Sequence, residues 1–418
     1  IGGNALKENT TASNNTAVGD DCLRANTTGG SNTAVGQAAL TANTTGSSNT
    51  AVGGQALETN TTGADNVAVG QGALELSTTA SYNTAIGKNS LTATTTGHSN
   101  TALGTNALVA NTTGANNIAL GRRAAYGITT GNYNTALGVN TLYNNNNSSN
   151  TAVGYSALGW SSGASNTAVG ANSAEATTSG ENNTAVGQGS LATNSTGSNN
   201  TALGKAALYS NTTGEDNIAI GEQALENNTT AFYNVAVGSQ AMEANTTADR
   251  NVAIGHQALT TNQVGDRNTA VGYRALTTHA PGSASDTQNV AVGYAALEAD
   301  TTGKNNTGLG AYALQANTTA SYNIAVGYIA MAVNTTGELN TAVGSFSLDA
   351  NTTGSYNVAL GYNTLTTAST ADENTAVGYT ACQNTTTGHS NAALGTCALQ
   401  ENTTGTYNIG LGPSALRR

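Results

Sequence analysis

The sequence is poor in residues that usually hold a globular domain together. Its 418 residues include 3 Cys, 2 Pro, 2 Phe and 1 Trp, and only 8% of them are charged. Three cysteines without a Cys-x-x-Cys pair do not make a disulfide framework. We expect Cys22, Cys382 and Cys397 to fill small buried or half-buried positions, with a bond between Cys382 and Cys397 as the alternative.

Charge and long apolar runs are scarce as well. The net charge is −11, from 23 acids and 12 bases, and neither sign is clustered. Nucleic-acid binding requires clustered Lys and Arg, so this composition excludes nucleic acid as a partner. No apolar run reaches the roughly 18 residues of a membrane-spanning helix, so we expect no membrane span in this segment.

Patterns typical of catalytic and metal-binding sites are missing too. The four histidines, His98, His256, His279 and His389, occupy unrelated places in the repeat described below, so no shared geometry gathers them. Asp does not recur on the period, as a calcium-binding repeat would require. We therefore predict that the protein is not an enzyme and has no catalytic residue, metal site or cofactor.

What the sequence does contain is one five-residue phrase, restated along its whole length. Asn32–Gly36 reads Asn-Thr-Ala-Val-Gly, and the phrase returns 17 residues later as Asn49–Gly53. It occurs 24 times at nearly constant spacing, with two steps of 16 after Asn134 and one step of 21 after Asn268. A fixed short period is typical of repeat architectures. We expect residues 1–418 to form a single continuous array, cut within a repeat at both ends.

The length of the period selects the architecture. Seventeen residues are too few for a two-helix repeat, and frequent Gly, Thr and Asn disfavour helices. Two short strands joined by two tight turns use about 17 residues, and such coils stack at about 4.8 Å. The sequence therefore predicts an all-β fold, a parallel β-solenoid of about 24 coils that makes a stiff rod on the order of 115 Å long.

The columns of the repeat suggest what lies inside each coil. With the opening Asn as position zero, position two is nearly always Ala, position three is Val, Ile or Leu, and position eight is Leu or a substitute. We expect positions three and eight to meet inside, so that an acid at Val186 would open a coil. Ala at position two would then face outward against an identical chain, favouring a homotrimer. The alternative places Ala inside and Val outward.

Two further columns have an expected backbone role. Gly at position four is predicted to take a corner with positive φ or to permit close backbone approach. Asn at position zero is predicted to form a hydrogen-bonded ladder from coil to coil, as stacked amides do in cross-β arrays.

The phrases "NTAVGQAAL" and "NVAVGQGAL" resemble the head repeats of trimeric autotransporter adhesins, the YadA-like heads, and the long Asn/Thr-rich arrays of tail-fibre-like proteins. Asn, Ala, a β-branched residue and Gly coincide in order over the whole chain, although the coils of those heads are shorter. The resemblance implies a left-handed parallel β-roll, usually trimeric, on an extracellular stalk or fibre.

One corner of the repeat carries a modification motif. Asn-x-Thr is an acceptor sequence for N-glycosylation, and glycans on it would line one edge of the array. The alternative is that Asn-Thr-Thr-Gly is simply turn chemistry. The candidate asparagines are Asn9, Asn26, Asn43, Asn60, Asn111, Asn211, Asn245, Asn317, Asn334, Asn351 and Asn402.

Aromatic residues are the other candidate contacts. Tyr favours the position before the opening Asn and the position after Gly, where rings could bind sugars or a neighbouring chain, or merely shield the strand corners. The candidates before Asn are Tyr82, Tyr133, Tyr233, Tyr322, Tyr356 and Tyr407; those after Gly are Tyr155, Tyr273, Tyr294, Tyr328, Tyr362 and Tyr379. Trp160 is a further candidate in one of two irregular regions, 143–166 and 277–288, where loops are expected to carry contacts.

These observations favour a mechanical role over a chemical one. We expect an extracellular structural fibre or adhesin shaft or head, on a cell-surface appendage or a virion, that self-associates as a homotrimer or an end-to-end filament. The alternative is a repeat surface that binds carbohydrate or ice, with host or environmental glycans as partners.

Overall fold

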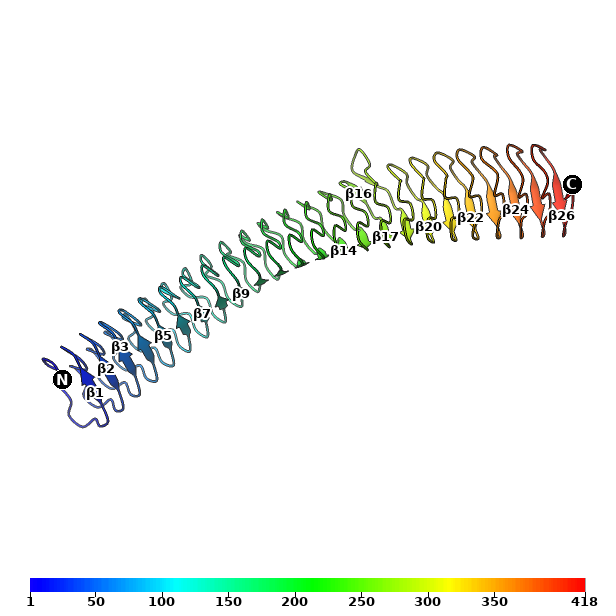
Figure 1. Cartoon of the computed structure of the whole chain (residues 1–418). Helices are drawn as coiled ribbons and strands as arrows, with labels where there is room; N and C mark the ends of the chain where they lie inside the picture. The colour runs from blue at the N-terminus through cyan, green and yellow to red at the C-terminus, as the bar shows by residue number, and fades with distance from the viewer. Residues whose placement is uncertain (418) are drawn as a thin grey trace. The chain divides into compact units, whose positions relative to one another are not determined.

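The computed structural model describes residues 1–417, and this part of the chain is all-β with no helix. It divides into two units, Ile1–Ala206 and Ala207–Arg418, each a stack of similar coils (Figure 1). In each unit, successive strands pair in parallel at the spacing of the repeat. The predicted parallel β-solenoid is therefore confirmed.

Each regular coil contributes one strand of three residues. In the first unit these are β1 (Thr16–Val18), β2 (Thr33–Val35), β3 (Thr50–Val52), β4 (Val67–Val69), β5 (Thr84–Ile86), β6 (Thr101–Leu103), β7 (Ile118–Leu120), β8 (Thr135–Leu137), β9 (Thr151–Val153), β10 (Thr167–Val169), β11 (Thr184–Val186) and β12 (Thr201–Leu203). In the second unit they are β13 (Ile218–Ile220), β14 (Val235–Val237), β15 (Val252–Ile254), β17 (Thr269–Val271), β19 (Val290–Val292), β20 (Thr307–Leu309), β21 (Ile324–Val326), β22 (Thr341–Val343), β23 (Val358–Leu360), β24 (Thr375–Val377), β25 (Ala392–Leu394) and β26 (Ile409–Leu411).

Equivalent residues of neighbouring coils lie side by side. Between β2 and β3, for example, Thr33 pairs with Thr50 and Ala34 with Ala51. The register is kept where a coil has 16 residues and where one has 21. The additional residues therefore leave the sheet untouched and form the loop that projects beside β16 in Figure 1, where β16 (Gly265–Asp266) pairs with β18 (Ser285–Asp286).

The prediction of two strands per coil was wrong, because the side opposite the sheet is a turn segment. Its backbone reverses direction through left-handed residues such as Ala38 (φ 56) and Leu40 (φ 53). A left-handed conformation costs a non-glycine residue roughly 1–2 kcal/mol. Bonds between coils offset this cost: the Leu40 N–H donates to the Ala56 carbonyl oxygen at 3.0 Å. Both sides of the coil are thus hydrogen-bonded along the stack.

The expected assignment of inside and outside was also wrong, and the alternative is correct. Ala34, at position two, is fully buried, whereas Val35 is half-exposed on the outer face. The coil is too narrow for a larger inward side chain. At Gly308, which replaces this Ala, an added Cβ would lie 3.2 Å from the Ala313 carbonyl oxygen and 3.4 Å from the Leu297 Cγ. A methyl group already fills the space beside the buried Leu of position eight.

The predicted asparagine ladder at position zero is confirmed in each unit. Within each unit, the side-chain oxygen of one opening Asn accepts the backbone N–H of the next at 2.8–3.0 Å. The side-chain nitrogen of Asn32 reaches across the coil to the Gly46 carbonyl oxygen at 2.9 Å. The ladder therefore joins successive coils, and at most opening asparagines it also closes the coil.

Gly at position four takes the predicted corner with positive φ. Gly36 has φ 133, and a Cβ there would lie 2.5 Å from the carbonyl oxygen of Gly53 in the next coil. Glycine is required at this corner both for its backbone conformation and for the close approach of the next coil.

Candidate functional surfaces

The outer face of the strands is the largest regular surface of each unit. Because side chains alternate along a strand, positions one and three point outward when position two points inward. We call these two columns the outward sheet face; every residue in them is Thr, Val, Ile, Leu or, once, Ala. Leu103 and Leu120, in adjacent coils, are 43% and 45% exposed. A continuous uncharged face of this kind is unusual on a solitary soluble protein and often marks a contact surface.

The glycosylation candidates do not lie on the surface. Asn26, Asn43 and nearly all the others are fully buried, and Asn9 and Asn402 are half-buried. In every one, the side-chain nitrogen donates to the carbonyl oxygen three residues later. In several neighbouring coils it also donates to the equivalent Asn oxygen, as from Asn43 to Asn26 at 2.7 Å. At the fully buried candidates, a glycan on that nitrogen would require these contacts to break.

These asparagines form a second ladder that the sequence interpretation missed. It occupies position eleven, whereas the expected ladder occupies position zero. The signal was available, because the residues three places after the candidates are all Gly or Ala and leave room for the bond. Turn chemistry, the alternative interpretation of Asn-Thr-Thr-Gly, is therefore the better one.

The tyrosines that precede Asn do not form a row. Tyr82, Tyr133 and Tyr356 are each 60–66% exposed, and the members of this column lie at least two coils apart in the sequence. They are separate surface rings. Where one of them has an aromatic neighbour, that neighbour comes from a different position of the repeat, as Phe232 does when it meets Tyr233 edge to face.

The tyrosines that follow Gly form a stack in the second unit. From coil to coil the ring centroids are 5.1–6.2 Å apart, and parallel and edge-to-face pairs both occur. We call this set the aromatic stack; its members are His256, Tyr273, Tyr294, Tyr312, Tyr328, Phe346, Tyr362 and Tyr379. Tyr155 lies in the first unit and stands apart from it. Sequence analysis missed Tyr312 and Phe346, which come from position six.

Trp160 borders a surface cavity in the first unit. The cavity has a volume of 220 Å³ and is lined by Arg123, Asn140, Tyr143, Ser156, Gly159 and Trp160. The Trp160 side chain is 57% exposed and contacts Tyr143. Of the two irregular regions, 143–166 is therefore the one that forms a hollow with polar and aromatic walls.

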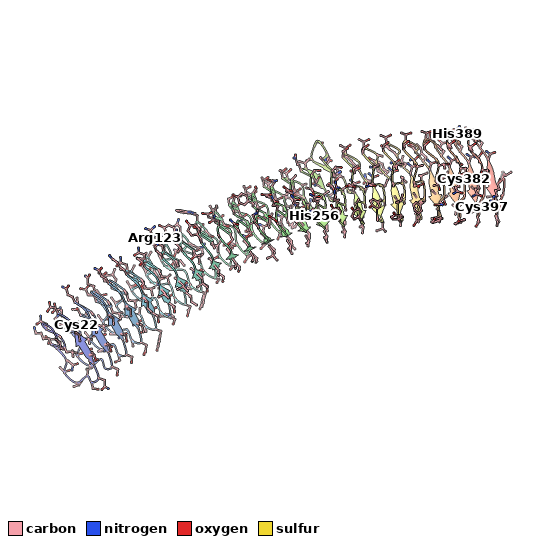
Figure 2. All side chains as sticks on the ribbon, in the orientation of Figure 1. Cys22, Arg123, His256, Cys382, His389 and Cys397 are labelled. Carbon is pink, nitrogen blue, oxygen red and sulfur yellow. The ribbon has the colours of Figure 1, made fainter. Side chains whose placement is uncertain are left out.

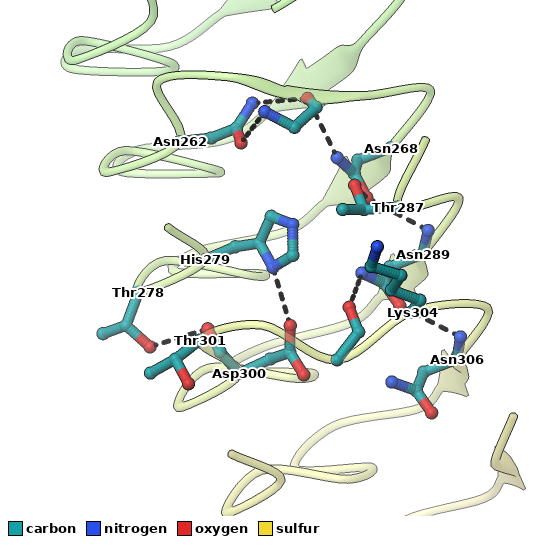
Figure 3. A network of polar contacts seen from close by, with 12 residues as sticks. Asn262, Asn268, Thr278, His279, Thr287, Asn289, Asp300, Thr301, Lys304 and Asn306 are labelled. Atoms are coloured by element: carbon teal, nitrogen blue, oxygen red, sulfur yellow. Dashed lines mark hydrogen bonds and ion pairs between the residues drawn. The ribbon is translucent and has the colours of Figure 1, made fainter. Parts of the chain in front are cut away.

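The other irregular region, 277–288, contains a buried polar pair (Figure 3). His279 and Asp300 are both fully buried, with His279 Nδ1 2.7 Å from Asp300 Oδ2. Both residues occupy position eleven, and Asp300 Oδ1 accepts the side-chain N–H of Asn317 at 2.7 Å. The pair thus replaces two rungs of the second asparagine ladder. Burial raises the pKa of the Asp300 carboxyl above its ordinary value, opposed by the hydrogen bond with His279.

The remaining chemical groups are dispersed. Within residues 1–417, no three His, Cys, Asp or Glu side chains lie together as a metal site requires. The cysteines labelled in Figure 2 are all free, including Cys382 and Cys397. Burial raises the pKa of the Cys382 thiol to about 11, so this thiol is neutral and unreactive at ordinary pH. In the same part of the chain, no helix has the length and hydrophobicity to cross a membrane.

No protein-family model matches the chain, and a search of curated proteins finds no match either. The resemblance to YadA-like heads therefore depends on the residues of the repeated phrase alone.

Proposed function

We propose that this protein is a structural component of an extracellular appendage, an adhesin shaft or head or a tail-fibre-like filament, and that it performs no catalysis. The observation that carries the proposal is the continuous bonding between coils in each unit. The hydrogen bonds of the strands, of the turn segments and of the two asparagine ladders all link one coil to the next along the stack. An array bonded in this way resists bending and extension, which is the property that a shaft requires.

The outward sheet face supports self-association. Three residues span roughly 10 Å, and the twelve or so coils of one unit extend about 55 Å, so each unit offers on the order of 550 Å² of uncharged footprint. The largest exposed apolar patch of a monomeric protein rarely exceeds this area. A stable interface buries about 800 Å² per partner. The outward sheet face of a single unit therefore supplies about two thirds of that area. A second copy, with the same uncharged columns, is the occupant that we propose.

A homotrimer is the assembly that we favour. Three copies around a threefold axis would turn all their outward sheet faces toward a common centre, and closed cyclic symmetry is usual among homo-oligomers. The sequence analysis argued for a trimer because Ala was expected to face outward. In the structure Ala faces inward, so the argument for a trimer depends instead on the exposed column of Val, Ile and Leu. It agrees with what the resemblance to trimeric adhesin heads implies.

The test introduces charge on the outward sheet face. The double substitution Leu103→Asp and Leu120→Asp should abolish self-association, because two carboxylates would be buried in each interface. Thr113→Asp, at an exposed corner, is the matched control and should leave assembly intact. Sedimentation equilibrium gives the mass, and circular dichroism confirms that each variant is folded. A parent protein that is monomeric over the whole concentration range would refute the assembly.

A second candidate function is sugar binding by the aromatic stack. Exposed rings such as Tyr273, Tyr294 and Tyr379, repeated at the spacing of the coils, offer phenol groups and ring edges to a glycan chain. Replacing these three tyrosines with Ser should then weaken retention of the protein on immobilised glycans. Unchanged retention would leave the stack with a purely structural role.

A further inference from the structure

The cavity beside Trp160 is formed where an aromatic column stops. Tyr126 and Tyr143, both at position nine, stack in parallel with their centroids 5.0 Å apart. The next coil has Gly159 at this position, so no side chain continues the stack. Trp160, one residue further on, meets Tyr143 edge to face with the centroids 5.7 Å apart. The hollow is thus bounded by two aromatic rings at the place of the missing side chain.

The polar wall of the cavity comes from position six of three successive coils. Arg123, Asn140 and Ser156 occupy this position and all line the cavity. These three side chains offer a guanidinium, an amide and a hydroxyl group to a ligand.

The cavity has basic residues on one side and an acid near the other. Lys88, Arg122 and Arg123 are the only Lys, Arg, Asp or Glu within residues 76–174, whereas Glu175 of the following coil approaches Gly159, with its Cγ 3.8 Å from the position of a Cβ there. Arg123 is exposed at the surface (Figure 2), and no carboxylate in the described chain forms an ion pair with it. Its guanidinium group is therefore free to bind an anionic group, and carboxylates are what Arg recognises through paired hydrogen bonds.

We propose that this cavity binds a sugar residue that carries a carboxylate, such as a uronic or a sialic acid. The apolar face of the sugar ring packs against Tyr143 and Trp160, its carboxylate pairs with Arg123, and its hydroxyl groups face the polar side chains of Asn140 and Ser156. The volume of 220 Å³ is several times the roughly 30 Å³ share of a water molecule and suits a single ring. The site lies in the other unit from the aromatic stack, and it depends neither on the stack nor on self-association.

Trp160 is the only tryptophan in the chain, so its fluorescence reports on this cavity alone. The probes are glucuronate, galacturonate and N-acetylneuraminate, compared with glucose, galactose and benzoate at matched ionic strength. We expect at least one acidic sugar to change the indole emission saturably, and its uncharged counterpart and benzoate to bind at least tenfold more weakly. Binding of the neutral sugar or of benzoate with equal affinity overturns the proposal, as does the absence of a response to all three acids.

Two variants and one control locate the binding. Arg123→Gln should weaken acidic-sugar binding by roughly tenfold or more. Arg122→Gln makes the same change in net charge one residue away, outside the cavity lining, and should retain nearly the parent affinity. Asn140→Tyr should block the cavity; the array already accepts Tyr at this position, as at Tyr312. Equal weakening by Arg122→Gln and Arg123→Gln would show general charge attraction, and binding that survives Asn140→Tyr would place the sugar elsewhere.

Discussion

Removing one rung of the position-zero ladder should weaken the array by an amount that the contacts define. Asn100 is fully buried, and its side-chain oxygen accepts the Asn117 backbone N–H at 2.9 Å. Its side-chain nitrogen donates to the carbonyl oxygen of Gly114 at 2.8 Å and to Asn83 Oδ1 at 3.2 Å. In Asn100→Ala all three bonds are lost together.

The three losses are not equal. The Gly114 oxygen keeps a second donor, the side chain of Asn111, and Asn83 Oδ1 keeps the backbone N–H of residue 100. These two bonds are therefore worth about 0.5–1.5 kcal/mol each, whereas the Asn117 N–H is left buried and unpaired at a cost of about 1–3 kcal/mol. We expect a total destabilisation of roughly 2–6 kcal/mol, concentrated in the coils on either side.

Hydrogen exchange is the appropriate assay, because repeat arrays open locally and one unfolding transition does not describe them. Protection of the Asn117 amide should fall by roughly 30-fold or more, since each 1.4 kcal/mol is a factor of ten. Asn144→Ala, the same substitution at an exposed residue outside both ladders, is the control. If Asn100→Ala and Asn144→Ala gave the same protection at Asn117, the ladder would contribute nothing to coil stability.

Three other predictions follow from the interior of the coil. Ala185→Val should destabilise the protein by about 1–3 kcal/mol through overpacking, whereas Val186→Thr on the outer face should change stability by less than about 0.5 kcal/mol. Urea unfolding measures both changes. A larger loss of stability in Val186→Thr than in Ala185→Val would show that Val, not Ala, faces the interior. The double variant His279→Asn and Asp300→Asn restores the asparagine ladder and should melt higher than the parent. Because burial raises the pKa of Asp300, the folded parent holds this proton more tightly than the unfolded chain and loses stability as pH rises through the raised pKa. The advantage of the variant should therefore widen with increasing pH, and a constant gap in melting temperature would contradict the pKa shift. In folded protein produced in a glycosylating host, peptide mapping by mass spectrometry should find the fully buried asparagines of the second ladder, such as Asn26 and Asn43, without sugar; sugars on these asparagines would invalidate the second ladder.

The period of the sequence was sufficient to predict the fold, because a repeat that aligns identical residues allows one parallel register. Asn32 and Gly36 could also be given roles from chemistry alone, since a stacked amide and a glycine corner each have one obvious use. The orientation of Ala34 and Val35 could not be predicted in this way. Both residues are apolar, and the choice depends on the width of the coil, which the backbone turn at Leu40 determines.

Sequence reasoning missed the candidate sites for a related reason. The turn segment was expected to be a strand, and aromatic candidates were sought only before the opening Asn and at position five, so position six was not considered. In the structure the left-handed residue at position six places Tyr312 on the same surface as Tyr294, at a centroid distance of 5.2 Å. The cavity at Trp160 likewise depends on Gly159, a residue that is ordinary in the sequence and matters because the two preceding coils have Tyr126 and Tyr143 at the same position.

The scarcity of charge has different causes on the inner and outer surfaces of the coil. Inside, the columns are filled by Ala, Leu and two asparagine ladders, and a charge would have no partner there. Outside, exposed corners do accept charge, as at Lys88 and Glu181. The outward sheet face is equally accessible, yet neither of its columns contains a charged residue in any coil. Narrowness of the coil cannot account for that exclusion, because these side chains point away from the interior. A second uncharged surface packed against these side chains does account for the exclusion of charge. For this reason the self-association proposal depends on positions one and three.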